Sequence, residues 1–195
     1  MKLKELIQSD FARYVQTYRL RGQPFSERKV FWESLLFKAG FQAVFLYRIS
    51  HWLFQKGWIH LAWFVTRLNI WFTGAEIEFN ARIGPGLFVA HPVGIVIGRG
   101  TEMGEGVTLF QGVSFVVKSW HPNEIGRFPK VGNHCYFFSH ALVLGGITIG
   151  NHCVVAAQAV VTKDLPSGAL AKGVPAAIYP GEGKVAIDSW TKESE

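Results

Sequence analysis

The residues of this chain that could do chemistry gather where a regular sequence pattern breaks. Apolar residues recur at every sixth position over long stretches, but the spacing rises to eight around His91-Pro92-Val93-Gly94 and to sixteen across residues 116–130. The second interruption contains His121, Arg127 and Phe128. A solenoid with a regular core has no reason to break its register except to build something. Both interruptions therefore mark the expected active site.

A repeated tetrapeptide holds two further histidines and the only two cysteines. Gly132-Asn133-His134-Cys135 returns eighteen residues later as Gly150-Asn151-His152-Cys153, so the two copies should lie at the same place on successive coils. The stacked histidines could suggest a metal, but two ligands without a third do not make a site, and no metal is expected. The cysteines should face the interior one strand spacing apart, about 4.8 Å. A disulfide is geometrically conceivable, and two buried thiols are the preferred expectation.

The six-residue period predicts the fold, because it fits neither a helix nor a single strand and is typical of a solenoid of short strands and turns. Its apolar positions fall into three blocks: Ile77, Ile83 and Val89; Ile97, Met103, Leu109 and Phe115; and Val131, Phe137, Val143, Ile149, Val155 and Val161. Three hexapeptides close one coil of a triangular prism. We therefore expect a parallel β-helix over residues 74–180.

The first 73 residues have a helical pattern instead. Apolar residues over 3–18 follow i, i+3, i+4 spacing, and a second helical stretch is expected from about Glu27 to Gln55. A last, short helix should begin near Ile59.

The chain is thus predicted to be α+β, with a helical, aromatic-rich basic segment over residues 1–73, a β-helix domain over 74–180 that carries an inserted loop at 116–130, and a polar tail over 181–195. The tail is expected to be frayed.

Composition excludes a disordered chain, since apolar residues make up 49% and charged residues 17%. Residues 1–73 hold 11 Lys/Arg, 4 Asp/Glu and 17 of the 28 aromatic residues, a net charge of +7, whereas residues 74–195 have a net charge of −1. Such a basic aromatic segment could touch an anionic membrane surface. The alternative is a helical cap or an oligomer interface. Nucleic acid is not an expected partner.

No secretion signal or membrane-spanning run is recognisable. The start of the chain is polar, and Lys56 and Arg67 interrupt the best apolar stretch. We therefore expect a cytoplasmic protein, with the inner membrane face as the alternative.

Five motifs carry a resemblance to a known family. They are Phe41-Gln42-Ala43, Tyr47-Arg48-Ile49-Ser50-His51-Trp52-Leu53, Ala81-Arg82-Ile83-Gly84-Pro85-Gly86-Leu87-Phe88, Thr162-Lys163-Asp164-Leu165-Pro166 and Gly173-Val174-Pro175-Ala176. Over roughly residues 35–180 the chain resembles the serine O-acetyltransferases, a branch of the left-handed β-helix (hexapeptide) acyltransferases. The resemblance implies a left-handed β-helix, a homotrimer and the pairing of trimers that is frequent in this family.

The resemblance also implies an O-acetyltransferase that uses acetyl-CoA. The family's catalytic histidine falls on His91, which would act as general base and take the proton from the acceptor hydroxyl. The family has an aspartate fifteen residues earlier, where this chain has Glu76. Glu76 would orient His91 and stabilise its imidazolium form, as the acidic residue of a triad does.

Two departures from the family concern the acceptor. The residue before the catalytic histidine is usually aspartate, and here it is Ala90. The family's loop motif Arg-His-Pro-Lys becomes Arg127-Phe128-Pro129-Lys130, with His121 as a distant substitute for the missing histidine. A free amino acid needs counter-groups for its ammonium and carboxylate, whereas an aromatic face suits a sugar ring and Arg127 could bind a uronic acid.

Acetyl-CoA lies, in this family, in the groove between neighbouring prisms of the trimer. The matching positions here are Ser139, Gly145 and Ala157, beside backbone amides that could stabilise the developing oxyanion. Lys163 and Lys172 are candidates for contacting the CoA phosphates.

The leading prediction is transfer of an acetyl group to a hydroxyl of a saccharide, such as a polysaccharide precursor. The alternative is L-serine acetylation for cysteine synthesis. A non-catalytic β-helix scaffold is the rival from another class, and the presence of both His91 and Glu76 argues against it.

Overall fold

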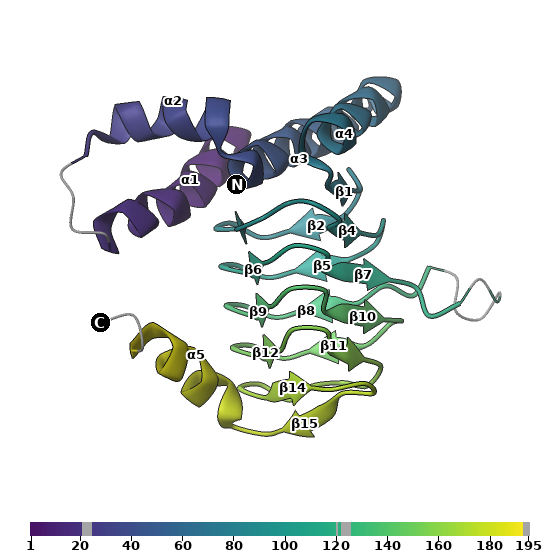
Figure 1. Cartoon of the computed structure of the whole chain (residues 1–195). Coiled ribbons are helices and arrows are strands. Elements are labelled where there is room, and N and C mark those ends of the chain that lie inside the picture. Colours follow the sequence, from purple (N-terminus) through teal and green to yellow (C-terminus); the bar gives the residue numbers. More distant parts are fainter. Residues whose placement is uncertain (21–24, 120, 122–125, 193–195) are drawn as a thin grey trace.

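The computed structural model describes residues 1–20, 25–119, 121 and 126–192, apart from the side chains from residue 188 onward. Four helices lie across one end of a stack of strands, and a further helix leans against the other end (Figure 1). Among the described residues, no helix combines the length and apolarity that crossing a bilayer requires.

The N-terminal helices are α1 (Leu3–Leu20), α2 (Glu27–Phe37), α3 (Ala39–Gln55) and α4 (Ile59–Thr73). The prediction of one helix from Glu27 to Gln55 is wrong, because Lys38 takes an extended conformation between α2 and α3. The break allows the backbone of α3 to reach the β-helix at Gly40, where a Cβ atom would collide with the Val89 carbonyl. The last helix is longer than expected and ends at Gly74, whose φ of +74° is left-handed.

The strands form three sheets that make the three faces of a prism. Sheet A contains β1 (Glu76–Ile77), β4 (Val96–Ile97), β7 (Ser114–Val116), β10 (Leu142–Leu144) and β13 (Val160–Val161). Sheet B contains β2 (Arg82–Ile83), β5 (Glu102–Met103), β8 (Lys130–Val131) and β11 (Thr148–Ile149). Sheet C contains β3 (Phe88–Val89), β6 (Thr108–Leu109), β9 (Tyr136–Phe137), β12 (Val154–Val155), β14 (Leu170–Lys172) and β15 (Ala177–Tyr179).

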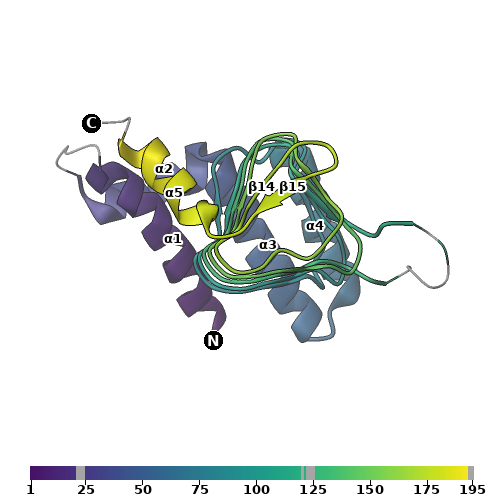
Figure 2. The ribbon, with the colours of Figure 1, turned by 90° about the horizontal axis from the view of Figure 1, so that it is seen from below.

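All neighbouring strands pair in parallel except β14 and β15, which close the stack as an antiparallel pair. The period-six residues occupy the second, inward-facing position of the short strands and form the core: Ile77, Val89, Ile97, Leu109, Phe115, Phe137, Val143 and Val155 are completely buried. The expected parallel β-helix is therefore confirmed. Seen along its axis, the stack is a rounded triangle (Figure 2).

The two interruptions of the period lie at different corners of this triangle. The CA corner, where the chain passes from sheet C to sheet A, comprises residues 90–95, 110–113, 138–141 and 156–159. The AB corner, where it passes from sheet A to sheet B, comprises residues 78–81, 98–101, 117–119, 121, 126–129, 145–147 and 162–164. His91 lies at the CA corner, and the described ends of the loop over 116–130 leave the prism at the AB corner, on the side away from α1 and α5 (Figure 2).

The expectation of a frayed tail is corrected by α5 (Glu182–Lys192), which contacts β12 and β14. The helix begins with a close backbone approach, in which the Gly183 amide donates to the Gly168 carbonyl at 2.8 Å. A Cβ atom on Gly183 would press against that same carbonyl. Polar composition alone did not reveal this contact, because a backbone approach leaves no apolar pattern.

A buried ion pair fastens the helices to the first coil. Arg48 on α3 donates from Nε and Nη2 to the carboxylate of Asp10 on α1, at 2.8 and 3.0 Å, and both side chains are almost fully buried. Arg48 also donates to the carbonyls of Ile83 and Gly84, at 2.6 Å each, while Asp10 accepts from the Leu87 amide at 2.8 Å. Two helices and the turn between β2 and β3 thus share one hydrogen-bonded cluster.

Candidate active site

The strand that leads to His91 is held by the helices. β3 is the first strand of sheet C, so the backbone of Val89 has no strand above it. The Tyr14 hydroxyl takes the place of that strand, donating to the Val89 carbonyl at 2.9 Å and accepting from the Val89 amide at 3.2 Å. Burial raises the pKa of Tyr14, so the hydroxyl stays protonated. The helices therefore fix the chain two residues before His91, which itself is exposed.

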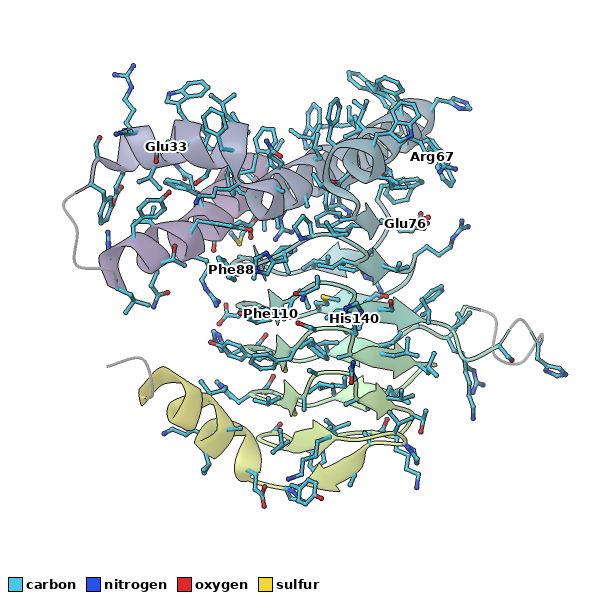
Figure 3. All side chains as sticks on the ribbon, viewed as in Figure 1. Glu33, Arg67, Glu76, Phe88, Phe110 and His140 are labelled. Carbon is cyan, nitrogen blue, oxygen red and sulfur yellow. The ribbon has the colours of Figure 1, made fainter. Side chains whose placement is uncertain are left out.

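Glu76 lies across the same corner from His91. It begins β1, which pairs with β4 in the register Glu76–Val96, and the Gly94 amide donates to the Gly74 carbonyl at 3.0 Å. The two side chains are both exposed and flank the first turn of the CA corner (Figure 3 labels Glu76). Within the described residues, no hydrogen bond or ion pair joins them. The expected pair therefore borders the same turn, with no hydrogen bond or ion pair between the two side chains.

A second carboxylate lies two residues after Glu76. Glu78 is half-buried at the AB corner, and burial is the main cause that raises its pKa, with the charge of Glu76 acting in the same direction. Arg99 and Arg67 act in the opposite direction. The charges of Glu76, Arg99 and Arg67 thus all act on the Glu78 carboxylate, which follows β1 directly.

The turn below His91 contains residues that the sequence interpretation missed. The Gly112 amide donates to the Val93 carbonyl at 3.0 Å, so residues 111 and 112 lie directly under the His91 turn. The Gln111 side-chain oxygen is buried and has no hydrogen-bond partner among the described residues. It is a free acceptor within the same corner.

Beside this turn, the rings of Phe110 and Phe138 stack with centroids 4.9 Å apart and planes 17° apart (Figure 3 labels Phe110). These phenylalanines lie 28 residues apart in sequence, because the loop adds ten residues to one coil of eighteen. A search at a fixed interval of eighteen does not find the pair. Counting from either side of the loop would have aligned it.

The structure divides the expected acceptor residues between two corners. Ala90 precedes His91 at the CA corner and donates its amide to the Leu109 carbonyl. Phe128 lies at the AB corner, half-buried, with its ring against the backbone of Gly98 and Gly100. Part of the ring is therefore covered by packing within the chain.

The rest of the loop lies at the AB corner as well. Arg127 is exposed and packs its Cβ against Gly146, and His121 is exposed further out, with its amide donating to the Ser119 hydroxyl at 3.3 Å. One copy of the chain does not bring these side chains together with His91.

The expected CoA-binding residues divide in the same way. Ser139 and Ala157 are stacked at the CA corner below His91, where the Gln158 amide donates to the Ser139 carbonyl at 2.9 Å. Lys172 ends β14 on the same side, exposed, with its ammonium 4.2 Å from the centre of the Tyr179 ring. Gly145 and Lys163 occupy successive turns of the AB corner.

The repeated tetrapeptide is structural in this chain. Cys135 and Cys153 are buried free thiols, as expected, and donate to the carbonyls of Gly150 and Pro166 at 3.1 Å each. The two histidines before them have positive φ angles, and their rings stack with centroids 5.2 Å apart. Among the described residues, no group of three or more histidine, cysteine or acidic side chains is arranged to hold a metal ion.

Comparison with known proteins is consistent with this geometry. Residues 128–163 match the family described as bacterial transferase hexapeptide (six repeats). The chain is 37% identical over 157 residues to a serine acetyltransferase of Helicobacter pylori strain J99. The aligned region covers 80% of this chain and 90% of the relative. It is 32% identical over 154 residues to the serine acetyltransferase of Bacillus subtilis strain 168, covering 79% and 70%.

The chain belongs to the serine acetyltransferase family. Soybean serine acetyltransferase complexed with serine superimposes with a TM-score of 0.79 at 26% identity, covering 91% of this chain and 69% of that one. A serine acetyltransferase in complex with CoA superimposes with a TM-score of 0.78 at 28% identity, with the same coverage. The β-helix is accordingly left-handed, and the protein is an O-acetyltransferase that takes its acetyl group from acetyl-CoA.

Proposed function

We propose that this protein transfers the acetyl group of acetyl-CoA to the hydroxyl of L-serine. The observation that carries the proposal is the 37% identity to a serine acetyltransferase over nine tenths of that relative's length. The likeness to a serine-bound structure of a plant member supports it. These relatives favour the serine alternative over the saccharide that the altered acceptor residues first suggested.

In the proposed reaction His91 is the general base. It takes the proton from the serine hydroxyl while the hydroxyl oxygen attacks the thioester carbonyl. The carbon–sulfur bond then breaks, and the CoA thiolate receives a proton from the imidazolium of His91. Glu76, across the corner, stabilises the positive charge that His91 carries between these two transfers. The products are O-acetylserine and free CoA, and His91 returns to its neutral form.

We further propose that the site is completed by a second copy of the chain in a homotrimer. In one copy His91, Ser139 and Ala157 lie at the CA corner, whereas Arg127 and Lys163 lie at the AB corner. When prisms pack side by side around a threefold axis, the CA corner of one faces the AB corner of the next. Such a groove would unite the general base with the loop arginine, which is suited to bind the serine carboxylate.

A saccharide hydroxyl is the second candidate acceptor. Ala90 cannot act as a counter-charge for the ammonium of serine, and Phe128 offers an aromatic ring where the family has histidine. The packing of Phe128 on Gly98 and Gly100 reduces the strength of this argument, since the ring is half-buried within the chain.

Release of free thiol from acetyl-CoA tests the proposal directly. Turnover that depends on L-serine supports it. Full acetyl-CoA binding without serine-dependent turnover would reject serine and direct the assay to sugars and uronic acids.

The variant His91→Ala tests the general base. Its turnover should fall about 10²- to 10⁴-fold while the fold is retained, the range expected for loss of a general base. His60→Ala, an exposed histidine on α4, is the matched control and should keep full turnover. Unchanged turnover in His91→Ala would exclude His91 as the base.

A further inference from the structure

Large apolar side chains are exposed in unusual number on the N-terminal helices. Of the fifteen exposed large hydrophobic residues in the described part of the chain, ten lie between residues 32 and 72. We call these ten the cap face: Trp32, Leu36, Phe37, Trp58, Ile59, Leu61, Trp63, Phe64, Trp71 and Phe72. The most exposed of them are more than 70% accessible. An exposed apolar surface of this extent is rare on a monomeric protein that has no binding partner or membrane contact at that surface.

The cap face belongs to α2, α4 and the turn before α4, which lie at the end of the prism. Ring side chains stand above α2 and above the α3–α4 pair, on the side away from the strands (Figure 3). A shallow hollow of about 270 Å³ is lined by Leu35 of α2, by Gln42, Phe45 and Leu46 of α3, and by Phe72 of α4. Of the cap face, Phe72 borders this hollow, which joins α4 to α2 across α3.

Cations accompany the apolar residues. Arg28, Lys29, Lys38, Lys56 and Arg67 are exposed on the same helices and at their ends. Two glutamates of α2 are paired within the chain, one with Arg19 at 3.0 Å and the other with Lys29 at 3.7 Å, so Lys29 does not count toward the surplus of cations. The surface thus combines tryptophan, phenylalanine and leucine with a surplus of positive charge.

We propose that the cap face lies on an anionic membrane surface as a peripheral contact. Tryptophan prefers the boundary between lipid headgroups and acyl chains, and each lysine or arginine near an anionic leaflet adds about a fivefold gain in affinity. Charge complementarity favours lipid over a second copy of the same face, because two such faces in contact would bring cation against cation. The prism axis would then stand along the membrane normal, with the His91 coil nearest to the lipid.

Co-sedimentation with vesicles tests the proposal. The protein should pellet with phosphatidylcholine vesicles that contain phosphatidylglycerol, should pellet less with phosphatidylcholine alone, and should be released by high salt. Arg28→Gln/Lys56→Gln should weaken binding about 25-fold, for two charges removed. Phe64→Ser/Trp71→Ser should reduce binding at low salt as well, since it removes apolar contact.

The double variant Lys184→Gln/Val185→Ser is the matched control. It removes one exposed cation and one exposed apolar side chain on α5, at the far end of the prism, and should bind vesicles as the unchanged protein does. Thermal melting and thiol release should be unaltered in all variants, because none of these residues belongs to the proposed site.

Three results would overturn the proposal. The first is failure of the unchanged protein to pellet with anionic vesicles. The second is equal binding by the cap-face variants and the control. The third is a particle mass in solution that halves in Phe64→Ser/Trp71→Ser without any vesicle binding, which would assign the cap face to a second copy of the chain.

Discussion

Replacing Arg48 by methionine should lower the free energy of unfolding by about 3–5 kcal/mol. The substitution leaves the Asp10 carboxylate buried without its cation, and breaking a buried pair from one side has a cost in this range. The carbonyls of Ile83 and Gly84 lose their donor at the same time. Since the chain has 195 residues, each kcal/mol should shift the melting temperature by about 2–4 °C.

The pH dependence of the variant gives a sharper test. Burial is the main cause that raises the pKa of Asp10 even with Arg48 present, and removing Arg48 removes the strongest group that opposes this rise, leaving only the backbone amides of Leu87 and Gly86. A carboxyl whose pKa is raised on folding contributes stability that is complete below its unfolded value of 3.8 and is lost as the pH rises through the folded value. Arg48→Met should therefore lie closer to the unchanged protein at pH 5 than at pH 8.

Urea unfolding followed by circular dichroism measures the effect, in a cycle with Asp10→Asn and the double variant. The double variant should be destabilised by at least about 1 kcal/mol less than the sum of the single variants. The surface ion pair Arg19–Glu27 is a matched control, because its atoms lie 3.0 Å apart while its side chains are 65% and 63% exposed. Arg19→Met should lower the free energy of unfolding by less than about 1 kcal/mol. A cost below about 1 kcal/mol for Arg48→Met, or strict additivity, would refute the reasoning.

Two further predictions concern the coil that carries the candidate base. Tyr14→Phe should lower the free energy of unfolding by about 1–3 kcal/mol, because the buried Val89 amide and carbonyl lose their hydrogen-bond partner. Because His91 follows Val89 by two residues, the variant should also have a lower kcat and an unchanged KM for acetyl-CoA. An unchanged kcat would contradict this. Burial lowers the pKa of His51, whose Nδ1 donates to the Phe79 carbonyl, so stability should be lost as the pH falls below the ordinary value of 6.5. Urea titrations at pH 7.5 and 5.5 should show this loss in the unchanged protein and a smaller one in His51→Gln.

The β-helix could be predicted from sequence because its cause is local and repeated. Every coil buries an apolar residue at the same position in each six, as at Ile97 and Phe137, so the same short pattern returns many times. The breaks at His91 and in the loop over 116–130 were found by the same counting. Which aromatic residues of the helices are buried and which are exposed could not be predicted, because the helical segment is apolar on several sides. Phe41 is 1% exposed, whereas Phe37 is 78% exposed.

The sequence by itself thus determined the coil, its two interruptions and the residues within them. Only the tertiary structure decided that His91 and Arg127 stand at different corners, since a corner is defined by how coils stack and not by distance along the chain. It also decided that Asp10 and Arg48, 38 residues apart, share one buried cluster with the first coil. Such contacts have no period, because each joins distant segments once and leaves no repeated pattern to count.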